Sequence, residues 1–347
     1  MNRIQSAAGV SVLIACNNDK FLLETLRSVR DQDFPSEKIE LVLIESCYRV
    51  GSVHRDYIRD NFVNHQILQC SAPGVVAARN LGLSAAVFDL VAILDADDRM
   101  KAGRIALQVK RFQRCPGLVA LGGQIQFIDE IGKPFDGGHY HLSDFILRLN
   151  MVTANPLAHP ATMLLKSAVM AVGGYREGVP EDWDLCIRLS EVGLIQNLKN
   201  CVIDYRQSSD QLSRTPLYTS KAPREKMFES AMIRRLKSGD EFTERLVAVE
   251  EFKTDSLDSQ NSADLRFGLI QLASSLSPVP FRRPIRRLML KILSRLSTLI
   301  HRDLSLKQVT RIERMYIAIA NMASRFTKLF FVRLHSKSHI FLSKGDS

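Results

Sequence analysis

Short apolar runs alternate with amphipathic stretches over the first two thirds of the chain. Continuous apolar runs at 10–14, 39–44 and 91–94 predict strands buried on both faces of a mostly parallel sheet. Between them, apolar residues recur at helical spacing within 20–31, and Pro73-Gly74 opens a second helical stretch. This order of strands and helices predicts an α/β fold.

The same patterns predict the remaining elements before residue 206. Further strands are expected at 66–69, 119–121, 124–128, 161–165 and 201–205. Further helices are expected over 102–114, from Lys166 to Gly173 and from Glu181 onward. Gly122-Gly123 is expected to join two of these strands, and a turn is expected over 129–133.

From Pro216 onward the pattern becomes purely helical. Segments 281–302 and 304–334 combine an aliphatic stripe with many cations. The cations beside the first stripe are Arg282, Arg283, Arg286, Arg287, Lys291 and Arg295. We therefore expect two parts, an α/β domain over 1–215 and a basic helical region over 216–347.

The formal net charge of +10 is concentrated in this second part. Residues 277–347 hold 15 Lys and Arg against 3 Asp and Glu, whereas the preceding 276 residues hold 32 against 34. Few aromatic residues interleave with the cations, which favours an anionic membrane surface or a partner helix over nucleic acid. The same stripe could equally pack on the α/β domain or in a homo-oligomer, and both interpretations stay open.

Cysteine usage and hydropathy indicate a cytoplasmic protein, either free or peripheral on the inner face of a membrane. The six cysteines have no C-x-x-C spacing, so we expect free thiols in a reducing compartment. No apolar run approaches the roughly 18 to 20 residues of a membrane span. The apolar stretch 7–14 imitates a short signal peptide, but it also fits the first buried strand, which we favour.

Three carboxylates follow the strand at 91–94, in the motif Asp95-Ala96-Asp97-Asp98. Ligands of open α/β sheets bind outside the carboxyl ends of the strands, and clustered negative charge favours a divalent cation there. Glu45 and Ser46 end the strand 39–44, so they would point into the same crevice if the strands are parallel. The alternative for the three acids is a solvated turn with a helix cap.

Two later positions have both a structural and a functional interpretation. Arg79 is typical of a helix surface, although beside a diphosphate it would bind in a bidentate manner. Asp182 opens a helix and fits an ordinary N-cap. His159 suits a hydrogen-bonded structural histidine, and Trp183 suits either the core or a platform for a sugar.

In order and spacing, the motifs of 9–213 resemble those of family 2 glycosyltransferases of the GT-A fold, as found in bacterial surface-polysaccharide synthesis. The matching stretches are 10–14, 77–82, 94–98, Gly122-Gly123, His159-Pro160, 173–175, 181–185 and Arg188. The resemblance implies an inverting transferase that moves a sugar from a nucleoside diphosphate, with UDP the expected nucleotide, to a glycan or lipid-linked hydroxyl.

The resemblance also implies residue roles. Asp97 would hold Mn²⁺ or Mg²⁺ with Asp95, and Asp182 would act as general base with Glu181 beside it. Contacts to the donor are implied at Ala15, Asn17, Glu45, Ser46, Arg79, Asn80, Asp95 and Ala96.

Three departures from the family pattern leave alternatives open. The chain has Glu45-Ser46-Cys47-Tyr48 where the family commonly has Asp-Asp-Gly-Ser, and Ala15-Cys16-Asn17-Asn18 where it commonly has Pro-x-Tyr-Asn. Near Tyr205-Arg206, Gln207 stands where a His often follows. A nucleotidyltransferase, an inactive GT-A-fold protein and a binding protein that acts through its basic tail are the competing hypotheses.

Overall fold

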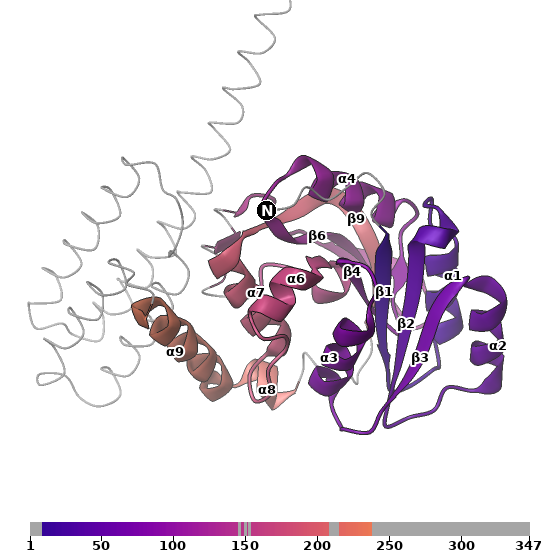
Figure 1. The fold of residues 1–347 in the computed structure, drawn as a ribbon, viewed down its shortest axis with the longest axis horizontal. Coiled ribbons are helices and arrows are strands. Elements are labelled where there is room, and N and C mark those ends of the chain that lie inside the picture. The colour runs from indigo at the N-terminus through magenta and orange to yellow at the C-terminus, as the bar shows by residue number, and fades with distance from the viewer. Residues whose placement is uncertain (1–8, 145–146, 149–150, 152–153, 208–214, 238–347) are drawn as a thin grey trace, which may run out of the picture. The chain divides into compact units, whose positions relative to one another are not determined.

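The structure of the protein is a computed structural model that describes residues 9–144, 147–148, 151, 154–207 and 215–237. All but the last three of these residues belong to one compact unit, Met1–Arg234 (Figure 1). The helices expected at 281–302 and 304–334 lie outside the described residues, so the division at 215 and the role of the basic region stay predictions.

Four parallel strands form one half of the sheet. They lie in the order β3 (Asn64–Cys70), β2 (Ile39–Ser46), β1 (Val10–Cys16) and β4 (Leu90–Asp95). Each strand matches a strand predicted above and extends one or two residues beyond it at one end or both. Because the strands are parallel, Cys16 pairs with Glu45 and Ala15 pairs with Asp95, which places both acids at the same edge.

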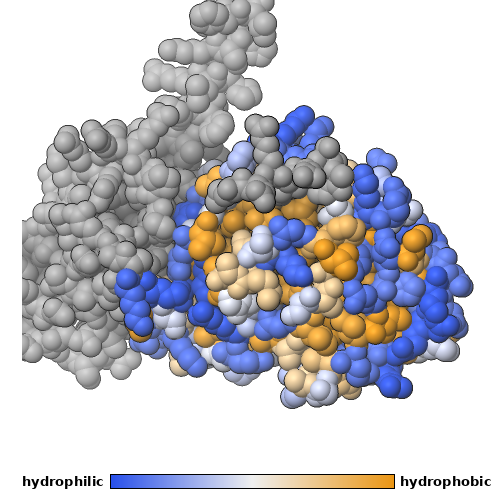
Figure 2. Space-filling view, viewed as in Figure 1, coloured by the Kyte–Doolittle hydropathy of each residue, from blue (hydrophilic) through white to orange (hydrophobic). Residues whose placement is uncertain are grey.

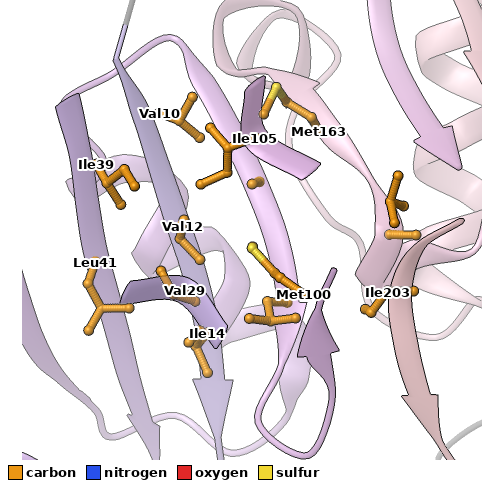
Figure 3. Packing of buried hydrophobic residues seen from close by; sticks show 14 of the residues in the cluster. Val10, Val12, Ile14, Val29, Ile39, Leu41, Met100, Ile105, Met163 and Ile203 are labelled. Carbon is orange, nitrogen blue, oxygen red and sulfur yellow. The ribbon is translucent and has the colours of Figure 1, made fainter. Parts of the chain in front are cut away.

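Alternate residues of these strands face opposite sides of the sheet. Val10, Val12 and Ile14 pack into a core formed with three helices (Figure 3). These helices are α1 (Leu22–Arg30), α2 (Ser52–Asn61) and α4 (Arg104–Arg114). On the other face lies α3 (Val75–Ala85), where a Cβ at Gly82 would come within 2.6 Å of Ile44 and 2.7 Å of Leu13. Glycine at this position therefore lets α3 approach the sheet closely.

The second half of the sheet is mixed. Short β8 (Met163–Leu165) runs antiparallel between β4 and β6 (Leu118–Ile128), and β9 (Leu194–Arg206) pairs in parallel with β6. The edge strand β5 (Arg99–Met100) pairs with β9, and β7 (Pro134–Gly138) forms a hairpin with β6. The expected α/β class with a mixed sheet flanked by helices is confirmed.

The prediction of two strands joined at Gly122-Gly123 is wrong, because β6 runs through both glycines. A Cβ at Gly122 would lie 2.1 Å from the Asn197 side chain, and one at Gly123 would lie 2.6 Å from Val202. The glycines therefore admit β9 side chains against β6 instead of turning the chain. The register between the two strands shifts at this point.

The remaining described elements are mostly short. They are η1 (Ser36–Lys38), η2 (His159–Ala161), α6 (Lys166–Ala171), α7 (Glu181–Val192), α8 (Pro216–Thr219) and α9 (Lys221–Lys237). Sequence patterns missed α2, β5 and β7. Within the described part of the chain, no helix is long and apolar enough to cross a membrane. Figure 2 shows a mainly hydrophilic surface around α2 and exposed hydrophobic residues nearer the middle of this face.

Candidate active site

The acids after β4 lie in a tight turn between β4 and β5, in which Asp98 N–H donates to the Asp95 carbonyl at 3.2 Å. The Asp95 side chain is 37% exposed, whereas Asp98 is buried. Burial, and then the charge of Asp95, raise the pKa of Asp97 to about 6. Burial, followed by its two acidic neighbours, also raises the pKa of Asp98. The turn therefore holds negative charge that the described residues compensate incompletely.

Arg206, the last residue of β9, holds this turn in place through hydrogen bonds. Its Nε donates to the Asp97 carbonyl at 2.9 Å, and its backbone N–H donates to Asp98 Oδ1 at 2.7 Å. The guanidinium is fully buried, donates to Glu24 at 2.8 Å and lies 4.0 Å from the ring centroid of Phe21. Sequence analysis assigned Arg206 no role, because a single Arg at a strand end carries no local signal.

A second buried arginine, Arg104, binds the backbone of β4 and of the segment just before β8. Its guanidinium donates to the backbone carbonyls of Pro160, Ile93 and Thr162 at 2.8, 2.9 and 3.0 Å. Burial lowers the pKa of Arg104 to about 9, and the charge of Asp98 opposes that shift. Arg104 is therefore still a cation at neutral pH, and it lies within the field of the acids.

Arg79 on α3 joins the turn to the start of α7. Its Nη1 donates to Glu181 Oε1 at 2.6 Å, and its Nη2 lies 3.4 Å from Asp95 Oδ1. Arg79 and Glu181 are both buried, so this ion pair is shielded from water. The predicted Arg79, Asp95 and Glu181 are thus brought together by three separate elements.

Asp182 lies next to this pair and is less buried than Glu181. Its Oδ2 accepts a hydrogen bond from Asn155 Nδ2 at 2.9 Å, and its Oδ1 accepts one from Trp183 N–H at 2.7 Å. Burial, and then the charge of Glu181, raise the pKa of Asp182 to about 6, while Arg79 opposes the shift. A carboxylate with a pKa near neutral is suited to accept a proton. The contact of Asn155 with Asp182 was not predicted, because the sequence indicated only a loop at Asn155.

Glu45 reaches the predicted edge but is buried against its own loop. Its carboxylate accepts hydrogen bonds from Val50 N–H at 3.0 Å and from Arg55. At the end of β1, Asp19 accepts hydrogen bonds from Gly51 N–H at 3.1 Å and from the Tyr48 hydroxyl at 2.9 Å. These bonds tie the loops after β1 and β2 together. Donor contacts by Glu45, and by its buried neighbour Ser46, stay predictions.

Asn80 uses both polar atoms of its side chain on the backbone of Tyr175. Its Oδ1 accepts from Tyr175 N–H at 2.9 Å, and its Nδ2 donates to the Tyr175 carbonyl at 3.0 Å. Gly174 has φ +65°, and a Cβ there would lie 2.6 Å from Asn80 Oδ1, so this turn requires glycine. The structure therefore gives Asn80 a structural role, and a donor contact stays a prediction.

The open interpretations of His159 and Trp183 are decided by their neighbours. His159 Nε2 lies 3.0 Å from the Tyr175 hydroxyl, and burial lowers the pKa of His159, so the ring is neutral. Trp183 is 7% exposed, and its Nε1 donates to the Met151 carbonyl at 3.0 Å. Both residues are part of the core around the site.

At the end of β1, Ala15 is partly buried and Asn17 is exposed. After β4, the Ala96 carbonyl accepts a hydrogen bond from the Thr25 hydroxyl at 2.9 Å. These three predicted donor contacts lie at the same sheet edge as Asp95. Their role toward a nucleotide stays a prediction.

The acidic turn fits a divalent cation that shares its ligands with a substrate. No group of three or more His, Cys, Asp or Glu in the described residues could hold a metal ion alone. Mg²⁺ is commonly held by one or two carboxylates together with substrate phosphates and water, a donor set that Asp95 and Asp97 match. Asp98 Oδ2, buried and without a hydrogen-bond partner among the described residues, is a further carboxyl oxygen beside this pair.

Residues 11–170 match the family model of glycosyl transferase family 2. This part of the chain is similar to glycosyltransferase family 2. The match confirms the resemblance seen in the motifs. It includes the acidic turn and Arg79, and it ends before Glu181 and Asp182.

A curated relative is the amylovoran biosynthesis glycosyltransferase AmsE of Erwinia amylovora. It is 26% identical over 149 residues, which is 41% of this chain and 53% of AmsE. The chain thus spans about half the length of this relative.

Solved structures with a similar fold include two of S. aureus TarS 1–349. The complex with UDP-GlcNAc has a TM-score of 0.50 at 16% identity and covers 65% of each chain. A second TarS 1–349 structure has a TM-score of 0.51 at 16% identity and covers 78% of this chain and 72% of TarS. At these identities the likeness concerns the fold, and it agrees with the GT-A architecture expected for the α/β domain.

Proposed function

We propose that the protein transfers a sugar from a nucleoside diphosphate to an acceptor hydroxyl, with inversion at the anomeric carbon. The observation that carries this proposal is the position of Arg79, bonded to Glu181 and 3.4 Å from Asp95. Arg79 thus links the first turn of α7 to the acidic end of β4. A proton acceptor and a site for the diphosphate are thus adjacent, as a single displacement requires.

Asp182 is the residue best suited to act as general base. Glu181 is 1% exposed, and each of its carboxylate oxygens accepts a hydrogen bond from a side chain, Arg79 on one and Tyr218 on the other. Asp182 is more accessible and accepts bonds from two uncharged donors. In this proposal Asp182 takes the proton of the acceptor hydroxyl as that oxygen attacks the sugar, and Glu181 holds Arg79.

Asp95 and Asp97 would hold Mn²⁺ or Mg²⁺. The bound cation would stabilise the negative charge on the diphosphate leaving group. Arg206 keeps the backbone of this turn in place, so both carboxylates are oriented before the donor binds.

The relatives support a more specific proposal for the substrates. TarS was crystallised with UDP-GlcNAc, and AmsE is named for the biosynthesis of amylovoran. We propose a UDP-linked donor and a glycan or lipid-linked acceptor in polysaccharide synthesis. We further propose that the basic residues of 281–334 hold the enzyme at the cytoplasmic face of the inner membrane. The alternative is that this segment packs on the α/β domain or on a second copy of the chain.

The test uses the full chain in two steps. Melting temperatures are first measured with UDP, GDP, CDP and dTDP sugars, with and without Mn²⁺, because a ligand that binds the folded state raises the melting temperature. Release of nucleoside diphosphate is then measured with the stabilising donor and glycan or lipid-linked acceptors. We expect metal-dependent release that EDTA abolishes.

Two outcomes would contradict the proposal. Release of pyrophosphate would indicate nucleotidyl transfer on a similar fold. Stabilisation by none of the nucleotides, at any metal concentration, would favour an inactive GT-A-fold protein.

A further inference from the structure

Residues beyond the family match hold helix α7 near both ends. Near the start of α7, the ring of Phe228 packs edge-on against Trp183 with 5.8 Å between centroids. Near its end, Arg234 donates two hydrogen bonds of 2.9 Å to the carboxylate of Glu191. Phe228 and Arg234 belong to α9, which lies beside α7 in Figure 1. The middle and the later part of α9 are therefore packed on the helix that carries Asp182.

Tyr218 makes the contact nearest to the reacting groups. Its hydroxyl donates to Glu181 Oε2, while Arg79 donates to Oε1 of the same carboxylate. Each oxygen of the buried Glu181 carboxylate thus accepts one hydrogen bond. A buried carboxylate oxygen without a donor would lower the free energy of unfolding. The ring of Tyr218 is placed by α8, in which Tyr218 N–H bonds the Thr215 carbonyl and Pro216 stands at the first helical position.

A chain of contacts therefore runs from Tyr218 through Glu181 and Arg79 to Asp95. The chain joins four elements, α8, α7, α3 and β4. Loss of the tyrosine hydroxyl would leave Glu181 with a single side-chain donor and free its carboxylate to rotate. The Glu181 carboxylate would then no longer hold Arg79 and the first turn of α7 in one orientation.

We propose that Tyr218 is a positioning residue for the transfer reaction, acting through Glu181 on Arg79 and Asp182. This inference rests on the proposed function and adds a residue that lies outside the family match. It also makes the start of the segment after residue 215 part of the catalytic machinery.

The first test compares Tyr218→Phe with Tyr57→Phe in the full chain. Tyr57 on α2 is a matched control, because its buried hydroxyl has no hydrogen-bond partner among the described residues. We expect Tyr218→Phe to lower kcat at least tenfold while the KM for the donor changes less than twofold, and Tyr57→Phe to change neither. A wild-type kcat in Tyr218→Phe, or a loss of the same size in Tyr57→Phe, would overturn the proposal.

Trp183 reports whether the variant merely loosens the packing. It is the single tryptophan of the chain, follows Asp182 directly and contacts Phe228. We expect Tyr218→Phe to keep the wild-type emission maximum and Phe228→Ala to shift it to longer wavelength. A red shift in Tyr218→Phe would show general loosening of α7 and would overturn the positioning role.

A double-mutant cycle decides the link between Tyr218 and Glu181 without any transfer reaction. We expect Tyr218→Phe to lower the melting temperature by several degrees in the wild type and by much less in Glu181→Gln. Equal decreases in both backgrounds would overturn the inference. A wild type that transfers no sugar would instead contradict the proposed function, and the cycle would still decide the link.

Discussion

The guanidinium of Arg79 donates a 2.6 Å hydrogen bond to the carboxylate of Glu181, 102 residues further along the chain. The pair is buried, and its cation also lies 3.4 Å from Asp95. One arginine thus separates two groups of acids that would otherwise repel each other. This arrangement sets the distance between the proposed base and the proposed metal site.

Asp97→Asn should abolish metal-dependent transfer while the fold is kept. The folded-state pKa of Asp97, about 6, lies above its ordinary value of 3.8. The stability that this shift contributes is present below pH 3.8 and is lost as the pH rises through about 6. In EDTA at pH 8 the variant should therefore melt at or above the wild-type temperature, and the difference should vanish near pH 4. A variant that transfers sugar normally would exclude the metal role.

Asp182→Asn should lower kcat on the order of a hundredfold or more and leave donor affinity nearly unchanged, as expected for loss of a general base. Asparagine keeps the size of the side chain and can still accept the hydrogen bond from Asn155. The measurement is kcat, together with the Kd of the donor from melting curves. If affinity collapses while bound enzyme turns over normally, Asp182 binds or caps instead of acting as a base.

Transfer should become slower as the pH falls through about 6. The pKa of Asp182 is raised to about 6, so below this pH the carboxyl is protonated and cannot accept the acceptor's proton. We expect kcat to fall nearly tenfold per pH unit below that value. At saturating Mn²⁺, which keeps Asp97 ionised, the residual activity of Asp182→Asn serves as control and should lack this limb. A wild-type profile flat from pH 5 to 8 would contradict the assignment.

Arg206→Lys should destabilise the protein and weaken metal binding. The buried guanidinium donates to the Glu24 carboxylate and to the backbone carbonyls of Asp97, Asp129 and Glu130. A lysine cannot replace all of these donors. We expect a loss of about 2 to 4 kcal/mol in the free energy of unfolding, measured by urea denaturation. The matched variant Arg111→Lys, at an exposed arginine, should change it by less than about 0.5 kcal/mol. Equal effects in both variants would show that Arg206 does not organise the turn.

The basic segment 281–334 should hold the full chain on anionic vesicles. Neutralising Arg282, Arg283, Arg286 and Arg287 should reduce co-sedimentation at low salt, since each cation near an anionic bilayer contributes about 1 kcal/mol. High salt should reduce binding of the wild type in the same way. Vesicle binding that is unchanged in the variant, or absent in the wild type, would favour packing of this segment on protein.

The sequence by itself determined the local elements and the position of the acidic motif. Runs such as 10–14 and 91–94 predict buried strands because burial on both faces requires apolar residues at consecutive positions. Asp95 and Asp97 follow from the same rule, since the residues after such a strand emerge at the sheet edge where ligands bind. The motifs at 77–82 and 181–185 then identified the family. Each of these signals lies within a short stretch of sequence.

Only the tertiary structure decided which groups meet. Arg206 contacts Glu24 across 182 positions, Glu45 is engaged by Arg55, and Tyr218 reaches Glu181 from a helix that follows the family match. Gly122-Gly123 is typical of a turn in sequence, but in the structure these glycines admit the side chains of β9. The physical reason is that burial makes a polar group depend on whichever donor or acceptor packing brings within about 3 Å, and local patterns carry no record of that partner.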